Sequence, residues 1–144
     1  MKKRQKLTKM NEQEFSLKIW LAELRAPFFT ASFVPVILGA VLAWHETHSF
    51  NLFYFLLTLL GVLALHAATN TLNDYFDYCS GNDLLNREAN RPFDGGSPFL
   101  LHGQLRPESV YRFGCGALLL GIGIGLFLVF RRGWWVLPMG LVGV

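Results

Sequence analysis

The sequence predicts an all-helical, polytopic membrane protein, and its composition and the spacing of its charges support this fold class. The chain of 144 residues is 52% hydrophobic and only 16% charged, so it has too little polar surface to cover a compact soluble domain. Residues 27–44, 51–73 and 113–130 contain no Asp, Glu, Lys or Arg. Each segment is close to the roughly 20 residues that a helix needs to cross a hydrocarbon core. Three membrane spans are therefore expected.

A fourth apolar run occupies residues 133–144, which is about half the length of a span. A helix that ended there would leave its last carbonyls without hydrogen-bond partners in lipid. We therefore interpret the chain as the N-terminal part of a longer protein, with a short natural protein as the alternative. Residues 1–24 are expected to form a basic cytoplasmic tail and an interfacial helix, and residues 25–144 the first part of a membrane domain.

Basic residues predict the orientation of the chain. Seven Lys and Arg residues fall in the first 25 positions, and positive charge near span ends favours the cytoplasm, so the N-terminus is expected inside. The link between spans two and three is also basic and returns to that side. Arg131 and Arg132 do not fit, because this topology puts them in an outer link. These two residues conflict with the predicted orientation, but the other eleven Lys and Arg residues agree with it, so the prediction stands. Cys79 and Cys115 then lie on the reducing side or in a span, so no disulfide is expected.

Two spans contain residues with particular consequences for helix packing. Pro35 lies in the middle of the first span, where it is expected to kink the helix or to be compensated by a neighbour. The third span is rich in glycine, and the spacing of Gly121 and Gly125 is typical of helices that approach one another closely.

The polar end of the second span concentrates side chains that bear oxygen. At 100° per residue, with Asn70 taken as zero, Asn73 falls at about 300°, Asp74 at about 40° and Asp77 at about 340°. These four side chains therefore share one face of the helix. Asp83 follows a Ser-Gly-Asn sequence that predicts the end of the helix, and it is expected to reach back from the loop.

A group of carboxylates on one helix face at a membrane boundary is energetically unfavourable unless its negative charge is neutralised. Like charges repel each other there, and ionisable groups at membrane depth are costly. A divalent cation would neutralise the carboxylates and so reduce both costs. Hard oxygen ligands suit Mg²⁺, which also binds substrate phosphates. The alternative is an ordinary polar helix end, with solvated side chains and with Asp74 paired to a nearby Arg.

Two arginines follow the acidic segment at a spacing of four residues. Arg87 and Arg91 can clamp a phosphate group bidentately if they lie beside a metal site. Their alternative role is solvation of the loop and the positive-inside bias.

A resemblance to a known family rests on these segments and on the start of the first span. The motif residues are Asn73-Asp74-Tyr75-Phe76-Asp77, Ser80-Gly81-Asn82-Asp83 and Arg91-Pro92-Phe93-Asp94-Gly95-Gly96-Ser97. They resemble the first aspartate-rich motif of the UbiA superfamily of intramembrane prenyltransferases, and most of all its 1,4-dihydroxy-2-naphthoate polyprenyltransferases of menaquinone synthesis. The opening Arg25-Ala26-Pro27 and Pro35-Val36-Ile37-Leu38-Gly39 are similar to the family's opening segment.

The resemblance implies about nine spans around a central cavity, with the first three to four in this chain. It implies Mg²⁺ as cofactor, a polyprenyl diphosphate and an aromatic acceptor as substrates, membrane lipid as surroundings, and no nucleic acid partner. Asp74, Asp77 and Asp83 would bind the metal, with Asp74 and Asp77 catalytic, and the diphosphate would contact Asn70, Asn73, Arg87 and Arg91. The family's second aspartate-rich motif is absent here, so the chain alone is expected to be inactive.

Two other classes of membrane protein use aspartates in or near their spans. Phosphotransferases acting on CDP-activated alcohols carry an Asp-Gly-x-x-Ala-Arg signature that is missing here. A transporter or channel subunit could pass cations along Asp74 and Asp77, but it needs acidic groups deeper in the bilayer. His66 is the sole titratable group deeper in the second span, and a lone histidine is more often a packed, hydrogen-bonded residue.

Overall fold

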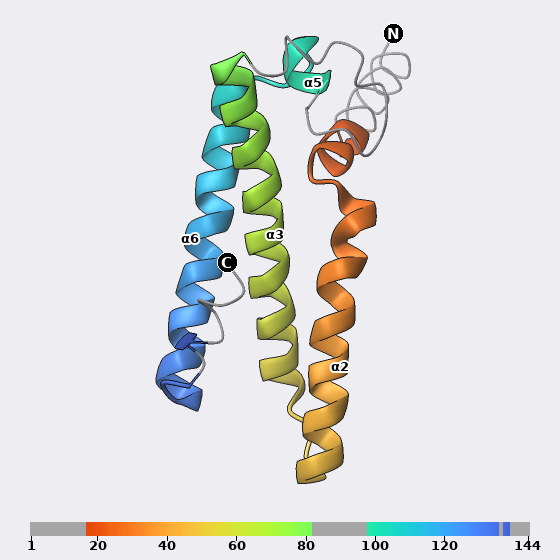
Figure 1. Cartoon of the computed structure of the whole chain (residues 1–144), viewed down its shortest axis with the longest axis vertical. Helices are drawn as coiled ribbons and strands as arrows, with labels where there is room; N and C mark the ends of the chain where they lie inside the picture. The colour runs from red at the N-terminus through yellow and green to blue at the C-terminus, as the bar shows by residue number, and fades with distance from the viewer. Residues whose placement is uncertain (1–16, 82–97, 136, 139–144) are drawn as a thin grey trace, which may run out of the picture.

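The described part of the chain is a bundle of three long helices with short helical pieces gathered at one end (Figure 1). The computed structural model describes residues 17–81, 98–135 and 137–138. In chain order the elements are a helical segment at residues 17–23, η1 (Ala26–Phe29), α2 (Thr30–Thr47), α3 (Leu52–Ser80), α5 (Pro98–Leu101) and α6 (Pro107–Arg132). Three stretches, Ala26–Thr47, Leu52–Ser80 and Pro107–Arg132, are long and apolar enough to cross a membrane. The predicted fold class is confirmed.

α3 is the central helix, with α6 packed along one side of it and α2 on the other (Figure 1). α2 exposes apolar side chains along its length, and Val34, Leu38 and Leu42 each leave more than half of their surface uncovered. It continues on both sides of Pro35 as one helix. A helix with so large an apolar surface is typical of a membrane span.

Glycines bring α3 and α6 close together. A Cβ atom on Gly121 would lie 2.6 Å from side-chain carbons of Leu65, and one on Gly114 would lie 2.8 Å from side-chain carbons of Leu72. The close approach predicted from the Gly121 and Gly125 spacing is found at Gly121, whereas a Cβ on Gly125 would meet none of the described residues within 4 Å. The contact repeats from Gly114 to Gly121, since seven residues are close to two helical turns and return to the same face.

The ends of α3 follow local sequence signals. Asn51 precedes the helix, and its side-chain oxygen accepts a hydrogen bond from the backbone N–H of Tyr54 at 3.2 Å. Gly81 ends the helix with a φ of +74°, which glycine adopts without steric cost. The polar residues before Gly81 are therefore helical up to Ser80, in one piece with the apolar part of the span.

A small apolar core caps the polar end of the bundle. It joins the helical segment at residues 17–23 to α5, to the start of α6 and to α3. Its buried members are Ile19, Leu100, Leu105 and Val110, with Trp20, Tyr75 and Phe99 packed against them. Residues 17–23 are helical and fall within residues 1–24, where the sequence predicts an interfacial helix, and residues 1–16 lie outside the described part. The core holds the N-terminal segment against the polar end of α3.

Arg131 and Arg132 end α6 at the opposite end of the bundle, and both contact Tyr54 near the start of α3. The guanidinium carbon of Arg132 lies 3.9 Å from the centroid of the Tyr54 ring, and Arg131 Nε donates a hydrogen bond to the Tyr54 hydroxyl at 3.4 Å. A cation over an aromatic face is attracted by the ring quadrupole. This contact gives the basic pair a packing role that is separate from its effect on topology.

The predicted orientation can be tested through Cys79, which is an exposed free thiol near the polar end of α3. A membrane-impermeant thiol reagent added to intact cells should leave Cys79 unlabelled, and it should label Cys79 in inverted membranes. Cys115 is the other free thiol of the described residues and would be replaced by serine for this measurement. Ser49→Cys at the opposite end of the bundle is the matched control and should label from outside. Efficient labelling of Cys79 in intact cells would contradict the orientation.

Candidate functional site

The centre of the candidate site is a buried ion pair between Arg25 and Asp74. Arg25 Nη2 donates a hydrogen bond to Asp74 Oδ1 at 2.8 Å. The side chain of Asp74 is only 2% exposed, whereas that of Arg25 is 32% exposed. A buried carboxylate is costly unless it is paired and hydrogen-bonded, and Arg25 supplies both the opposite charge and a hydrogen bond to Asp74.

A second contact ties the same face of α3 to the N-terminal segment. Asn70 Nδ2 donates a hydrogen bond to the backbone carbonyl of Leu24 at 3.2 Å. Asn70 and Asp74 are one turn apart on α3, and Leu24 and Arg25 are adjacent residues before η1. The two bonds therefore fix the register between the start of the first span and the polar end of α3.

The outer part of the polar face is formed by Asn73 and Asp77. Asn73 Nδ2 donates a hydrogen bond to Asp77 Oδ2 at 2.9 Å, along the same helix face at a spacing of four residues. Asn73 is exposed and Asp77 is half-buried, in contrast to the buried Asp74. The site thus has an inner carboxylate held by an arginine and an outer carboxylate held by an amide.

The remaining predicted site residues lie outside the described part of the chain. These are Asp83, Arg87 and Arg91, and the structure gives no position for them. Within residues 17–81, 98–135 and 137–138, no group of three or more His, Cys, Asp or Glu side chains is arranged to hold a metal ion. The described residues contribute two carboxylates, Asp74 and Asp77, to the predicted set of three metal ligands.

Sequence reasoning did not identify Arg25 as the partner of Asp74. It left an arginine partner open without naming one, and it used Arg25 for topology and for the family resemblance. The two residues are 49 positions apart, and Arg25 has a left-handed backbone with φ of +53°, which no propensity predicts for arginine. The sequence does contain a signal for the pairing of Arg25 with Asp74. A cation at the start of one span and an acid at the end of the next span lie on the same side of the membrane.

The donor set on α3 suits a hard cation. Carboxylate and carboxamide oxygens are ligands for Mg²⁺, which also takes water and phosphate oxygens. The contact from Arg25 does not exclude a cation, since a carboxylate offers about four acceptor positions on its two oxygens. Asp74 and Asp77 are therefore the described residues that could hold such an ion, with Asn70 and Asn73 beside them.

His66 lies one turn before Asn70 and is engaged in packing between α2 and α3. Its Nδ1 is 2.8 Å from the hydroxyl oxygen of Ser32, and its ring meets the edge of Phe29 with centroids 5.0 Å apart. This environment is that of a packed, hydrogen-bonded histidine. His66 is not an acidic residue, so it does not supply the acidic group deep in the span that a cation-conducting protein would need.

Comparison with known proteins points to one family. Residues 32–144 match the family model described as the UbiA prenyltransferase family. The chain is 34% identical over 115 residues to a 1,4-dihydroxy-2-naphthoate octaprenyltransferase of Bacillus subtilis (strain 168), covering 80% of this chain and 35% of that protein. No solved structure matches the chain.

Two further relatives are similar over comparable lengths. The chain is 32% identical over 120 residues to a 2-carboxy-1,4-naphthoquinone phytyltransferase of Synechocystis sp. (strain ATCC 27184 / PCC 6803 / Kazusa), covering 77% of this chain and 39% of that protein. It is 33% identical over 102 residues to UbiA prenyltransferase domain-containing protein 1 of Xenopus tropicalis, covering 71% of this chain and 27% of that protein. The chain thus spans about a third of the length of these curated relatives.

Proposed function

The chain belongs to the UbiA prenyltransferase family, and we propose that it forms part of an enzyme that transfers a polyprenyl group from an allylic diphosphate to an aromatic acceptor. The single observation that carries the site assignment is the buried Asp74 carboxylate, held by Arg25 on the same helix face as Asn70 and Asp77. A membrane protein retains a charge at such a position when the charge has a function.

The proposed acceptor is 1,4-dihydroxy-2-naphthoate, and the proposed pathway is menaquinone synthesis. Two of the relatives described above are named for naphthalene-derived acceptors, which supports this class of bicyclic aromatic. The donor would be a long-chain polyprenyl diphosphate. The enzyme would be integral to the inner or cell membrane, with the N-terminus in the cytoplasm.

The proposed cofactor is Mg²⁺, since enzymes of this family generally depend on a divalent metal. Asp74 and Asp77 would hold the ion with Asp83, and Asn70 and Asn73 would hydrogen-bond the diphosphate. When bound, the ion would neutralise the charge that develops on the diphosphate as the allylic C–O bond breaks.

The protein's own residues have three tasks in this scheme. Arg25 pairs with the Asp74 carboxylate and fixes its orientation. Asn73 orients the Asp77 carboxylate through its hydrogen bond to Oδ2. The apolar spans below the polar face keep water from the allylic carbon, so that the aromatic acceptor attacks it instead.

A direct assay tests the proposed activity. Full-length protein in lipid would be incubated with an octaprenyl diphosphate and with 1,4-dihydroxy-2-naphthoate, and the products would be identified by mass spectrometry. We expect a prenylated, decarboxylated naphthalene product that requires Mg²⁺ and that disappears with EDTA. 4-Hydroxybenzoate serves as the matched acceptor control, and faster transfer to that monocyclic ring would contradict the proposed acceptor.

Arg91 gives a separate prediction for the diphosphate contact. Arg91→Lys keeps the charge that affects topology but loses the planar fork that can hold two phosphate oxygens. If one charge-assisted hydrogen bond is lost, binding of the prenyl diphosphate should weaken by about 1.5 to 3 kcal/mol, which is roughly tenfold to somewhat over a hundredfold. Donor titrations at fixed Mg²⁺ and acceptor measure this. Unchanged saturation in Arg91→Lys and Arg91→Gln would assign Arg91 to topology alone.

A further inference from the structure

Two adjacent arginines, Arg131 and Arg132, end α6 at the far end of the bundle from the candidate site (Figure 1). The 26 residues of α6 correspond to about 39 Å of helix, so this pair takes no part in the polar face of α3. The predicted orientation puts the pair in an outer link, where basic residues are disfavoured. The pair therefore conflicts with the topology signal and requires another explanation.

Tyr54, near the start of α3, holds both guanidinium groups in place. Arg131 Nε donates a hydrogen bond to the Tyr54 hydroxyl at 3.4 Å, and the guanidinium carbon of Arg132 lies 3.9 Å from the centroid of the Tyr54 ring. These contacts use one N–H of Arg131 and the flat face of Arg132. They do not use the terminal Nη groups, which can bind two phosphate oxygens at once. One aromatic residue thus positions two neighbouring groups that are suited to bind an anion.

In the described part of the chain, no carboxylate forms an ion pair with either arginine. The ion pairs found there join Arg25 to Asp74 and His45 to Glu46. Both arginines are exposed. Two positive charges that lie close together repel each other, so an anion bound between them would stabilise this end of the bundle.

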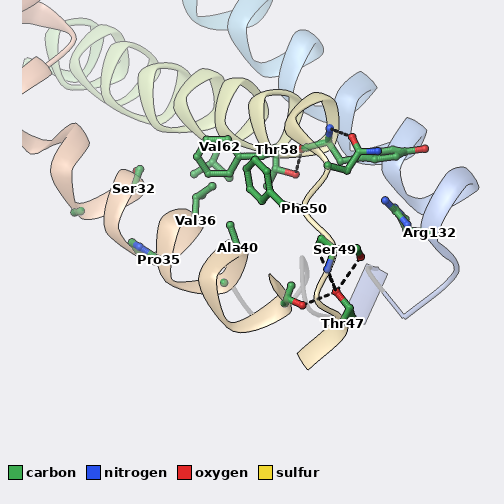
Figure 2. A pocket seen from close by; sticks show the side chains of 16 residues that line it. Ser32, Pro35, Val36, Ala40, Thr47, Ser49, Phe50, Thr58, Val62 and Arg132 are labelled. Atoms are coloured by element: carbon green, nitrogen blue, oxygen red, sulfur yellow. Dashed lines mark hydrogen bonds between the residues drawn. The ribbon is translucent and has the colours of Figure 1, made fainter. Parts of the chain in front are cut away.

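The surroundings of the pair are polar and lie at the level of a membrane surface. Arg132 lines one end of a groove between α2 and α3 together with Thr47 and Ser49 (Figure 2). The hydroxyl groups there can hydrogen-bond a polar head group. Trp134 and Trp135 follow the pair and are 75% and 84% exposed. Because tryptophan is enriched where spans meet the membrane–water interface, the arginines lie at the depth of lipid head groups.

We propose that Arg131 and Arg132 bind the phosphodiester group of an anionic phospholipid, such as phosphatidylglycerol. The two guanidinium groups supply the positive charge and the paired N–H donors that a phosphodiester accepts. The hydroxyl groups of Thr47 and Ser49 lie where they can contact the glycerol of the head group. A zwitterionic lipid is a poorer match, since its own cation is repelled by the pair.

Other sources of phosphate fit the pair less well. The diphosphate of the prenyl donor is expected at the polar face of α3, at the other end of the bundle. A soluble phosphate would have to bind from bulk water, where exposed ion pairs contribute little. The acyl chains of a phospholipid hold its phosphate at the membrane surface, so that phosphate is present beside the pair at a high effective concentration.

Photo-cross-linking to full-length protein in mild detergent locates the lipid. The probe is phosphatidylglycerol with a photoreactive group near its head group, and the cross-linked peptides would be mapped by mass spectrometry. We expect cross-links within residues 47–54 and 127–135. Unlabelled phosphatidylglycerol should compete for them at a concentration about tenfold lower than phosphatidylcholine needs. Inorganic phosphate and octaprenyl diphosphate should leave the yield unchanged.

Three double variants test the role of the arginines. Arg131→Gln with Arg132→Gln removes both charges and should lower the cross-link yield by about tenfold or more. Arg131→Lys with Arg132→Lys keeps both charges but loses the planar forks, so the yield should fall by about threefold or more. The matched control is Arg106→Gln with Arg112→Gln, which removes two exposed arginines near the other end of α6 and should change nothing.

Several results would overturn the inference. An equal yield in wild type and in the glutamine variant of the pair would show that the pair binds no lipid. A full yield in the lysine variant would show that the pair acts only as diffuse charge, and an equal loss in the control variant would show the same. Competition by inorganic phosphate or octaprenyl diphosphate as strong as that by phosphatidylglycerol would assign the pair to another anion. The measurement involves no prenyl transfer, so its outcome is independent of the proposed enzymatic function.

Discussion

Asp74→Asn is expected to remove nearly all prenyl transfer while leaving the packing of α3 intact. Asparagine has the same shape and still offers an oxygen to Arg25 Nη2, which now contacts Asp74 Oδ1 at 2.8 Å. The variant lacks the negative charge that a divalent cation requires. Since the loss of one preorganised electrostatic contact costs about 100-fold to 1000-fold in rate, we expect at least a hundredfold decrease in kcat. Asp74→Ala, Asp77→Asn and Asp77→Ala should show losses of similar size.

Thr69→Ala is the matched control on the same helix. Thr69 is exposed, and its hydroxyl donates a hydrogen bond to the carbonyl of Leu65 in its own helix at 2.9 Å. Transfer should stay near the wild-type rate in this variant. Near-normal, Mg²⁺-dependent turnover in Asp74→Asn or Asp77→Asn, at equal membrane levels, would count against the proposed site.

Arg25→Gln is expected to cause the largest loss of stability among single changes at the site. Removal of one partner from a buried ion pair costs about 3 to 5 kcal/mol, because the remaining charge is left in a poor solvent. About a third of the Arg25 side chain is exposed, so water relieves part of this cost and we expect about 1 to 3 kcal/mol. The free energy of unfolding in mixed micelles would measure the change.

A double-mutant cycle separates the ion pair from other effects of Arg25. If the contact to Asp74 dominates, Arg25→Gln combined with Asp74→Asn should destabilise the protein by less than the sum of the two single changes. Arg106→Gln is the control, since Arg106 is an exposed arginine near the same end of the bundle. Additive losses in the cycle would show that Arg25 and Asp74 act independently.

The sequence was sufficient to predict the helical membrane fold because the signal is simple. Long segments without charge exclude other classes of fold, and the stop at Gly81 is a local property of glycine. Helical periodicity also placed Asn70 and Asp74 on one face of α3. Both now contact the consecutive residues Leu24 and Arg25.

Contacts between distant segments could not be predicted in the same way. The partner of Asp74 depends on how the start of the first span lies against α3, and the left-handed backbone of Arg25 is part of that arrangement. The glycine contact was predicted correctly at Gly121 but not at Gly114, for a related reason. Gly121 and Gly125 have the spacing of a known motif, but which face of α6 meets α3 depends on side chains of the other helix, such as Leu65.

The central claim is that the polar face of α3 binds the metal–diphosphate head of the donor, and equilibrium binding tests it most directly. Binding of an octaprenyl diphosphate to the full-length protein would be measured with and without Mg²⁺, in wild type and in Asp74→Asn. We expect Mg²⁺ to strengthen binding to wild type by about tenfold or more and to have little effect on binding to Asp74→Asn. An equal gain from Mg²⁺ in both proteins would contradict this claim.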